Sequence, residues 1–492
     1  MSCRKGKGDR MNKVFMALLL VTALAAIEGT IVSTAIPSIT ADLLGVDLIS
    51  WIYSAYLLAS AIAAIIFGKL ADLFGRKRMI ITGIIIFLVG SMLCGLAQSM
   101  EQLIVFRAIQ GIGAGSILPI TLTMVGELFK TEKERAKGQS YLSMVWGVSG
   151  VVGPLFGGFI VDQVSWHFIF FINVPFGLAS IYLIAKHYKE QLEAVKRKID
   201  YLGAVFFTIG MVALLFVIIE NSKTQDWLSG QSLLMYGVAL VFLSIFIWVE
   251  LRAEEPIIPL TLFKNGRLMV INALTLSGMS IVIGVTVYIP IFAQSVLGKN
   301  ATQAGLLLTP MSIFWTVNSI MAGYLIGRLT NKRIIQMGTI LLVTGTLLLA
   351  RLSSGSSDFS VYFASSLIGL GMGFIMPMLM ISIQKVADPK QLGISIGLNS
   401  FTNTFSQAIG AALFGMIFNL ATSEKMASLG KGEIQLNGEF AKGGFNLEEV
   451  SFLKDTIANG VSYVYIATFI FAIGALIFSF FVATKSTRKA QS

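Results

Sequence analysis

The chain has 492 residues, of which 55% are hydrophobic and only 13% are charged, and its formal net charge is +11. Soluble domains carry about 25% charged residues, so this chain has too little polar surface to coat a soluble particle of its size. The apolar residues form long runs, which favours membrane helices of about 20 residues over barrel strands of about 9–11 residues. Two cysteines and two histidines are too few for a disulfide framework or a zinc site, so no metal is expected.

Fourteen apolar runs are long enough to cross a membrane as helices, and most connections between them are short. The sequence therefore predicts an all-α membrane protein with fourteen transmembrane helices. The predicted spans are, in chain order, 14–36, 48–68, 79–98, 102–127, 138–161, 167–187, 201–220, 232–251, 267–296, 302–326, 333–352, 360–383, 392–420 and 457–483.

The first span follows a basic stretch, residues 1–13, which is predicted to be a cytoplasmic tail. Its cations are Arg4, Lys5, Lys7, Arg10 and Lys13, and the apolar run behind them reaches Ile36. That run is longer than the about 7–15 apolar residues of a signal peptide. We therefore expect the segment to remain in the protein as the first transmembrane helix.

Lysine and arginine are distributed unevenly among the loops. Most of the 37 Lys and Arg residues fall in the loops on the side of the two termini. Positively charged loops stay in the cytoplasm, so both termini are predicted to be cytoplasmic and the protein is placed in the cell membrane as a multi-pass protein. The net positive charge then reflects topology and anionic lipid headgroups and does not indicate nucleic acid binding.

One exterior connection, residues 421–456, is much longer than the others. It contains Asn437-Gly438 between alternating residues, and Asn-Gly is a strong signal for a two-residue β-turn because both positions need positive φ. A small exterior β-hairpin is predicted there, with a disordered loop as the open alternative.

The turn between the second and third spans is rich in glycine and charge. A tight turn between membrane helices favours glycine, because backbones approach closely or adopt left-handed dihedral angles. The acid in this turn can pair with the neighbouring cations and form a latch that breaks in another conformation; alternatively, the cations only set the topology. The residues concerned are Gly68, Asp72, Gly75, Arg76, Lys77 and Arg78.

A degenerate copy of this turn recurs in the second half of the chain. Gly323 corresponds to Gly68, and Lys332 with Arg333 corresponds to the cation pair, but Gly327 stands where the first copy has its acid. Two parallel repeats within one transporter would leave such a trace in the sequence.

Three further motifs lie in spans 1, 4 and 5. Span 14–36 carries Glu28, and span 102–127 carries Arg107 followed by Gln110 and Gly111. Span 138–161 carries a run of small residues and a proline, namely Gly150, Gly153, Pro154, Gly157 and Gly158.

Together these motifs resemble motifs A, B and C of the major facilitator superfamily, in its fourteen-helix drug:proton antiporter branch of EmrB/QacA-like multidrug exporters. The resemblance covers essentially the whole chain, and residues 166–177, which contain Asn173, match a further segment of that branch. The sequence departs from the pattern at Leu73, at Glu28 in place of an aspartate, and at His167 in place of an arginine, which leaves the role of His167 open.

The resemblance implies the major facilitator fold, with two six-helix bundles and two extra central helices. The amino-terminal bundle would be residues 14–187 and the carboxyl-terminal bundle residues 267–483. Residues 188–266 would hold a linker and the extra pair, and residues 484–492 a cytoplasmic tail.

Glu28 and Arg107 are the clearest ionisable residues inside spans. A charge at mid-bilayer costs at least about 2.5–3.5 kcal/mol, so such residues usually face a cavity and carry function. Burial favours the neutral carboxyl and a nearby cation favours the charged form. If helix rocking alternates these influences, Glu28 takes up a proton on one side and releases it on the other. The resemblance assigns Arg107 a part in proton transfer, and the alternative is a static ion pair that only fixes spans 1 and 4.

The small residues of span 138–161 predict close helix packing. Gly153 and Gly157 stand four apart, as do Gly150 and Pro154, which produces faces that neighbouring helices can approach closely. Pro154 removes a backbone hydrogen bond and is expected to kink the helix. In the family this helix seals the closed conformation against leaks, while ordinary helix packing explains the same residues.

Candidate cargo residues are amides and aromatic side chains within spans. Amides can hydrogen-bond a ligand, and aromatic rings can stack on cations; each is also suited to bond a neighbouring helix or anchor the interface. The candidates are Tyr56, Trp146, Asn272, Gln294, Trp315, Asn318, Asn399, Asn403 and Gln407.

The sequence therefore predicts a proton-coupled exporter of small amphipathic drugs, either neutral or monovalent cations. Narrower cargoes within the same fold are tetracycline-like drugs, peptides, bile-type anions or lipids, and sodium is possible in place of protons. No cofactor beyond the ion gradient and no nucleic acid is expected, a monomer is expected, and an outer adaptor is left open. An enzyme is disfavoured because neither histidine belongs to a catalytic constellation, and a primary pump because no P-loop is present.

Overall fold

A computed structural model describes most of the chain. The described residues are 2–129, 132–188, 190, 200–224, 227–253, 256, 260–325, 328–387, 392–427 and 446–482.

The amino half of the protein consists of the helices before residue 188. Its elements are α1 (Ser2–Leu43), the short 3-10 helix η1 (Val46–Leu48), α2 (Ile49–Phe74), α3 (Arg76–Gly95), α4 (Met100–Leu128), α5 (Glu132–Gln163), α6 (Phe168–Phe171) and α7 (Asn173–His187).

The carboxyl half follows the extra pair, which is α8 (Tyr201–Thr224) and α9 (Gly230–Glu250). Its elements are η2 (Leu260–Lys264), α10 (Gly266–Ser295), α11 (Ala301–Leu325), α12 (Asn331–Ala350), α13 (Asp358–Val386), α14 (Leu392–Ala427) and α15 (Leu447–Ser479).

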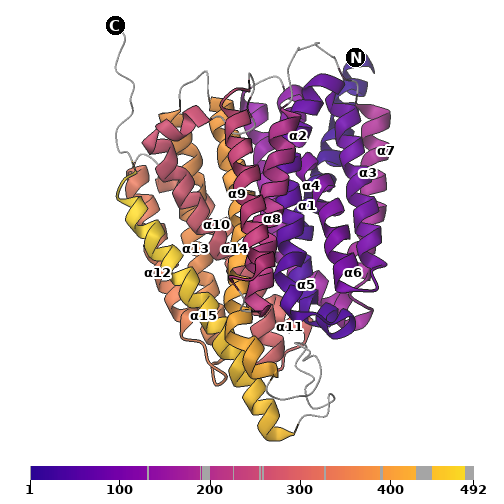
Figure 1. The fold of residues 1–492 in the computed structure, drawn as a ribbon. Helices are drawn as coiled ribbons and strands as arrows, with labels where there is room; N and C mark the ends of the chain where they lie inside the picture. The colour runs from indigo at the N-terminus through magenta and orange to yellow at the C-terminus, as the bar shows by residue number, and fades with distance from the viewer. Residues whose placement is uncertain are drawn as a thin grey trace.

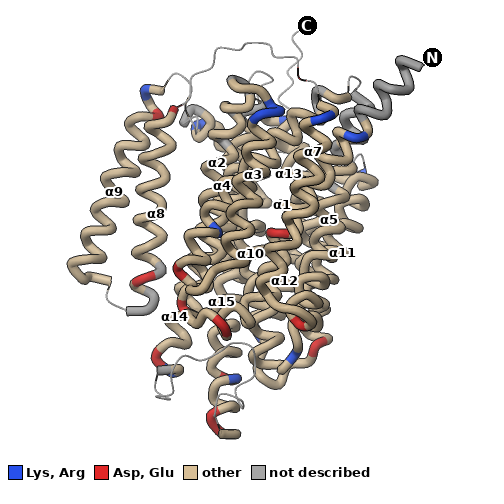
Figure 2. Tube along the Cα trace, turned by 90° about the vertical axis from the view of Figure 1, so that its right-hand side faces the viewer, with Lys and Arg blue, Asp and Glu red and all other residues tan. Residues whose placement is uncertain are grey.

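Fourteen membrane-length apolar helices occur in the described part of the chain, α6 and α7 together forming one of them, and this confirms the predicted number. The start of α1 and the end of α15 lie at the same end of the bundle (Figure 1). Charged residues gather at the two ends of the helices, with few in the central zone (Figure 2). Following the distribution of Lys and Arg in the sequence, we call the end that holds the start of α1 the cytoplasmic side and the other end the exterior side.

The helix pairings of the amino half recur in the carboxyl half. In the first, α4 packs on α2 and α3, and α1 packs on α5 and α7; in the second, α13 packs on α11 and α12, and α10 packs on α14 and α15. The halves meet where α2 contacts α14 and α5 contacts α11. In the internal repeat, α2 corresponds to α11 and α5 corresponds to α14. The contact of α2 with α14 is therefore equivalent to the contact of α11 with α5, and the interface between the halves is pseudo-symmetric.

The extra helices form a hairpin at one edge of the molecule (Figure 2). Besides α9, α8 contacts α14 of the carboxyl half and α2 of the amino half. Phe207 of α8 packs against Phe246 of α9 and against Phe401 and Phe405 of α14, at centroid distances of 5.0–6.1 Å. The pair therefore covers the edge where α2 meets α14.

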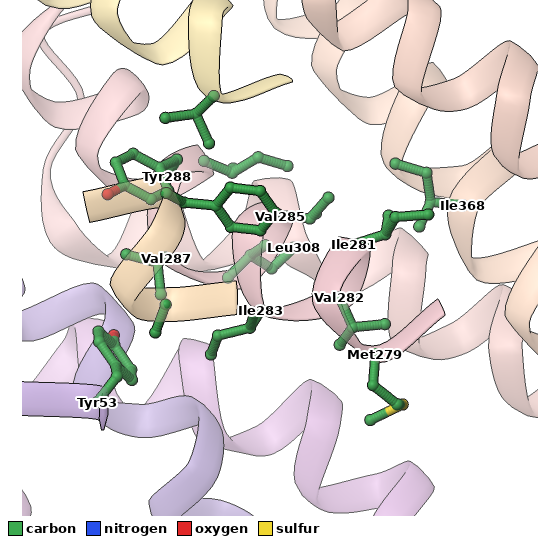
Figure 3. Packing of buried hydrophobic residues seen from close by; sticks show 14 of the residues in the cluster. Tyr53, Met279, Ile281, Val282, Ile283, Val285, Val287, Tyr288, Leu308 and Ile368 are labelled. Carbon is green, nitrogen blue, oxygen red and sulfur yellow. The ribbon is translucent and has the colours of Figure 1, made fainter. Parts of the chain in front are cut away.

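The apolar core shows which parts of the two halves are joined. One cluster contains Ile36 of α1 and Tyr53 of α2 together with most of α10, so it continues across the boundary on the exterior side (Figure 3). A second cluster, which includes Leu18, Phe67 and Ile84, stays within the cytoplasmic part of the amino half. The buried apolar contact between the halves thus lies toward the exterior.

Several helices are longer than the spans predicted from hydropathy. The expected tail 1–13 is helical from Ser2, α14 continues to Ala427, and α15 already begins at Leu447, so the ends of the predicted exterior loop 421–456 are helical. Asn446 and Glu449 form a capping box at the start of α15. Hydropathy marks only the part of a helix that lies in lipid, and polar residues can continue it into water. The predicted hairpin around Asn437 lies outside the described residues.

Candidate functional site

The amino half holds an ion pair in its interior. Glu28 lies midway along α1, and Arg107 lies about two turns into α4; each is only 1% exposed. The Arg107 guanidinium donates a hydrogen bond from Nη1 to the Glu28 carboxylate. The ion pair that the sequence analysis gives as the alternative to proton transfer is present, and both side chains are buried in the protein.

Further polar groups from α3, α4 and α7 complete this site. Asn173 Nδ2 donates to Glu28 Oε2 and to Ser91 Oγ, both at 2.9 Å. Arg107 Nη1 also donates to Gln110 Oε1 at 2.7 Å. Ser91 Oγ in turn donates to the Phe170 carbonyl at 2.8 Å. The carboxylate is therefore held by a cation and an amide, as a buried charge requires.

Helix α2 closes the site from the side of the carboxyl half. Arg107 Nε donates to the Ile52 carbonyl at 3.3 Å, and the guanidinium lies 4.0 Å above the ring centre of Tyr56. Tyr56 was a cargo candidate, and the structure places it instead against the cation of the ion pair. This arrangement orients the planar guanidinium by a carbonyl and a ring face together.

Glycine allows α4 to come this close to its neighbours. A Cβ at Gly111 would collide with the backbone of Tyr56, and a side chain at Gly115 would collide with the Ser60 carbonyl. The motif around Arg107 thus combines a buried cation with a helix face that only glycine can provide.

The turn of motif A contains a glycine with a positive φ, one of the two reasons given above for glycine in this turn. Gly75 has φ of +95° and joins the end of α2 to the start of α3. Glu190 caps that start, since its carboxylate accepts from the backbone N–H groups of Arg76 and Lys77. Lys77 Nζ also donates to the Ala185 carbonyl at 2.6 Å, whereas Arg78 is exposed. The side chain of Asp72, and so the predicted latch, lies outside the described part.

Gly68 and Gly323 occupy equivalent places in the two repeats. At each of them, a Cβ would have no neighbour within 4 Å. The close approach expected at Gly68 is therefore absent in this structure, because the helices are not pressed together there on the cytoplasmic side.

The helix of motif C lies between α1 and the carboxyl half. Gly153 and Gly157 face Thr30 and Ile31 of α1. On the opposite side of α5, the Gly150 carbonyl accepts from Ser312 Oγ at 2.8 Å, and Gly158 faces the start of α11. Helix α5 runs through Pro154 without ending. The small residues of α5 thus allow close packing both on α1 and on α11.

The exterior ends of the two halves are joined by hydrogen bonds. Asp162, at the end of α5, accepts from the backbone N–H groups of Ala301 and Thr302 at 3.1 and 2.9 Å, which caps α11 across the boundary. Gln294 Nε2 donates to the Thr34 carbonyl at 3.1 Å, and Asn419 Nδ2 donates to the Asp47 carbonyl at 3.0 Å. A carboxylate at a helix N-terminus is favourable because of the helix dipole. The molecule is closed toward the exterior.

Most amide candidates for cargo binding are engaged by the protein itself. Asn399 Nδ2 donates to Asn272 Oδ1 at 3.2 Å, and Gln407 Nε2 donates to Asn403 Oδ1 at 3.0 Å. Asn318 Nδ2 donates to the Leu370 carbonyl at 2.8 Å. The bonds of Asn399, Asn318 and Gln294 join different helices, as the alternative interpretation of the amides has it, whereas the bond of Gln407 lies within α14.

The two tryptophan candidates remain available. Trp146 of α5 is 44% exposed, and Trp315 of α11 is half-buried. A cavity of about 570 Å³ lies elsewhere, at the cytoplasmic start of α10, and contains none of the predicted residues. It is lined by Lys264, Asn265, Gly266, Arg267, Val270, Val386 and Phe481.

His167 lies on the exterior side, directly before α6. Its ring stacks on Trp166 at 3.7 Å between centroids, and its Nδ1 is 2.7 Å from Ser165 Oγ. Trp166 Nε1 donates to Asp42 at 3.0 Å, which ties this corner to the end of α1.

Fourteen membrane-length helices in two pseudo-symmetric halves, with a buried ion pair inside, define a multi-pass membrane transporter. The chain belongs to the Major Facilitator Superfamily, whose sequence model matches residues 18–411. The resemblance seen in the motifs is thereby confirmed.

Relatives with similar sequences carry names that refer to drug resistance. Multidrug resistance protein 3 of Bacillus subtilis (strain 168) is 38% identical over 434 residues, which cover 87% of this chain and 85% of that protein. The multidrug transporter protein MdtP of the same organism is 34% identical, covering 85% and 77%. The multidrug efflux pump SdrM of Staphylococcus aureus (strain N315) is 29% identical, covering 82% and 89%.

Solved structures share the fold at low sequence identity. A bacterial homolog of the human lysosomal transporter Spinster, in an inward-facing and unoccupied conformation, has a TM-score of 0.69 and 15% identity, over 96% of this chain and 97% of that chain. The nucleoside transporter NupG has a TM-score of 0.61 and 12% identity, over 95% and 98%. Both show the fold alone.

Sequence reasoning missed three of the residues described above. Asn173 was noticed only as part of a motif, and Glu190 and Asp162 were not selected as site residues. Asn173 could have been selected, because an amide within a matched motif of a membrane helix is itself a signal. Nothing local marks the other two, since each caps a helix far away in sequence.

Proposed function

We propose that this protein exports small amphipathic drugs in exchange for protons, by alternating access. The observation that carries the proposal is the buried Glu28–Arg107 pair, with Asn173 on the second carboxylate oxygen. A charge in this environment responds strongly to protonation, because neutralising the carboxyl removes its attraction to Arg107. The names of the similar proteins support drugs as the cargo.

Alternating access would use the closed exterior boundary as one end state. In the opposite state, the hydrogen bonds of Asp162, Gln294 and Asn419 across the halves would break. The open surroundings of Gly68 and Gly323 would then be filled as the cytoplasmic ends approach each other. Protonation of Glu28 would bias the exchange between these states, since it changes the charge balance of the amino half.

The cargo would be neutral or a monovalent cation. Glu28 is the only buried acid among the described residues of the two halves, while Glu250 lies in the extra helix α9. With no second buried acid among these residues to balance two cationic charges, no strong preference for divalent cations is expected. The exposed ring of Trp146 and the half-buried ring of Trp315 offer flat apolar surfaces to such a cargo.

Everted membrane vesicles provide the test. Respiration acidifies the vesicle interior, and an acridine dye reports its pH. Adding ethidium or norfloxacin should release protons with the wild-type protein and should fail to do so with Glu28→Gln. Glu250→Gln is the matched control, because it neutralises a buried acid outside both halves, and it should behave as the wild type.

Two outcomes would change this proposal. Normal proton release in Glu28→Gln would remove proton coupling through this residue. If exchange disappears when choline replaces sodium and persists without a pH gradient, sodium is the coupling ion instead.

A further inference from the structure

One face of α2 carries three hydroxyl side chains toward the carboxyl half. Ser50, Tyr53 and Ser54 stand at positions i, i+3 and i+4, so they lie on the same side of the helix. Ser54 Oγ donates to the Ala408 carbonyl of α14 at 3.1 Å, and Ser50 lies against Gly415 of the same helix. This face therefore forms part of the boundary between the halves.

Two of these hydroxyls are buried without a bond to the protein. Ser50 and Tyr53 are each 3% exposed, and neither hydroxyl has a hydrogen-bond partner among the residues that the structure describes. Buried polar groups are nearly always paired, so an unpaired one calls for an explanation. The third hydroxyl, Ser54, is committed to a carbonyl and needs none.

The inner end of this face reaches the ion pair. Tyr53 directly follows Ile52, whose carbonyl accepts a hydrogen bond from Arg107, and Arg107 in turn donates to Glu28. Its outer end is the start of α2 on the exterior side, because Ser50 is the second residue of the helix. The two unpaired hydroxyls thus lie in the first two turns of α2, with Ser50 nearer the exterior and Tyr53 beside the residue whose carbonyl binds Arg107.

Tyr288 of α10 faces Tyr53 from the other half. Figure 3 shows the two rings approaching across the boundary, among the apolar residues of α10. Tyr288 packs against Phe418 of α14 at 5.5 Å between ring centres, which fixes its ring. When the halves separate on the exterior side, water would enter the space between Tyr53 and Tyr288.

We propose that protons reach Glu28 from the exterior along the Ser50–Tyr53 face of α2. This inference rests on the proposed proton coupling and names its route. A hydroxyl can accept and donate at once. In each transfer the Tyr53 oxygen accepts a proton from an exterior hydronium ion, which is left as water, while the phenol's own proton passes to a Glu28 carboxylate oxygen. Two O–H bonds break and two form, so the phenol ends neutral and the carboxylate ends protonated.

Purified protein in liposomes distinguishes a proton route from a structural role. Two rates are compared: ethidium transport driven by a pH gradient, and exchange of ethidium for ethidium at equal pH, which needs no net proton movement. Tyr53→Phe keeps the ring and removes the hydroxyl. It should slow gradient-driven transport about tenfold, the effect of losing one well-placed hydrogen bond, and leave exchange unchanged. Ser50→Ala should show the same pattern, more weakly.

Tyr465→Phe is the matched control. Its hydroxyl is also buried and without a described partner, but it belongs to α15, which packs on α10, α12 and α14 of the carboxyl half, so neither rate should change. Unchanged gradient-driven transport in Tyr53→Phe, or an equal loss of both rates, overturns the route. Glu28→Gln separates the two proposals: if it keeps gradient-driven transport, proton coupling itself fails, whereas its loss beside an unaffected Tyr53→Phe rejects the route alone.

Discussion

The two halves share one pattern of helix packing and differ in what they bury. The amino half buries charge, since Glu28 and Arg107 are each 1% exposed. Among the described residues of α10 to α15, the buried polar side chains are amides and hydroxyls without charge, such as Asn272, Gln294 and Asn318. The two repeats therefore share one architecture but differ in whether they bury charged side chains.

This difference indicates how work is divided between the halves. A buried ion pair changes its energy sharply when one member takes up a proton, whereas an amide pair hardly responds to pH. The proposed coupling thus belongs to the amino half, and the carboxyl half would serve as the neutral surface against which it moves. Substitutions of matched type in the two halves can test this contrast.

The largest effect is expected at Arg107. Arg107→Gln leaves the Glu28 carboxyl buried without its cation, which should lower stability by about 3–5 kcal/mol. The apparent melting temperature in detergent, followed by tryptophan fluorescence, measures the loss. The double variant Glu28→Gln with Arg107→Gln removes both charges and should recover part of it. A double variant as unstable as the single one would show that the charge itself is not what matters.

A smaller loss of stability is expected when an amide side chain is removed, and its size should depend on whether the acceptor is a carboxylate or a neutral carbonyl. Asn173→Ala removes a donor to a carboxylate and should cost about 1.5–3 kcal/mol, while Asn318→Ala removes a donor to a carbonyl and should cost about 1 kcal/mol. The same melting experiment compares the two. Equal losses would argue that the charge on Glu28 adds nothing to its bond with Asn173.

A still smaller loss of stability is expected when the hydrogen bond between Asn399 and Asn272 in the carboxyl half is removed. Asn399→Ala removes its bonds to Asn272 and Thr275, and hydrogen bonds between membrane helices are worth about 0.6 kcal/mol on average. Proton release in vesicles should stay normal, because no charge changes. Loss of proton release in this variant, with a normal melting temperature, would assign coupling to both halves.

The smallest effects are expected at the equivalent glycines Gly68 and Gly323. Each lies in a helix with open space at its Cβ position, so substitution by alanine should raise stability by about 0.5 kcal/mol through helix propensity. Transport rates test the other conformation. If the cytoplasmic ends close tightly in that state, Gly68→Ala should slow transport without lowering the melting temperature. Gly158→Ala is the contrasting control, since a methyl group there would collide with the backbone of α11 and should destabilise this state.

The sequence predicted those features that depend on local pattern. The fourteen spans follow from runs of apolar residues, the side of the termini follows from the loop cations, and the left-handed Gly75 follows from a tight turn. The pairing of Glu28 with Arg107 was predictable because a charge inside a membrane needs a partner and few candidates exist.

Features that depend on which helix ends meet were not predictable in this way. Asp162 caps α11 in the other half, and Glu190 caps α3 from beyond α7; neither shows any periodicity or motif of its own. The same reason applies to the amides, because the sequence marks Asn399 as polar but does not tell whether it faces a cargo or Asn272. Hydropathy also misplaced the polar ends of some helices, such as the start of α1, the end of α14 and the start of α15.

The cap that Glu190 provides has a consequence for anyone who wishes to shorten this protein. Glu190 belongs to the segment that leads from α7 to the extra hairpin, and it holds the first amides of α3. A twelve-helix version joined directly after His187 would delete the hairpin and uncap α3 in one step, and its failure would be wrongly attributed to the missing hairpin. A splice placed beyond Glu190 keeps the cap of α3 and deletes only the hairpin. Its transport activity therefore shows whether α8 and α9 are required for function.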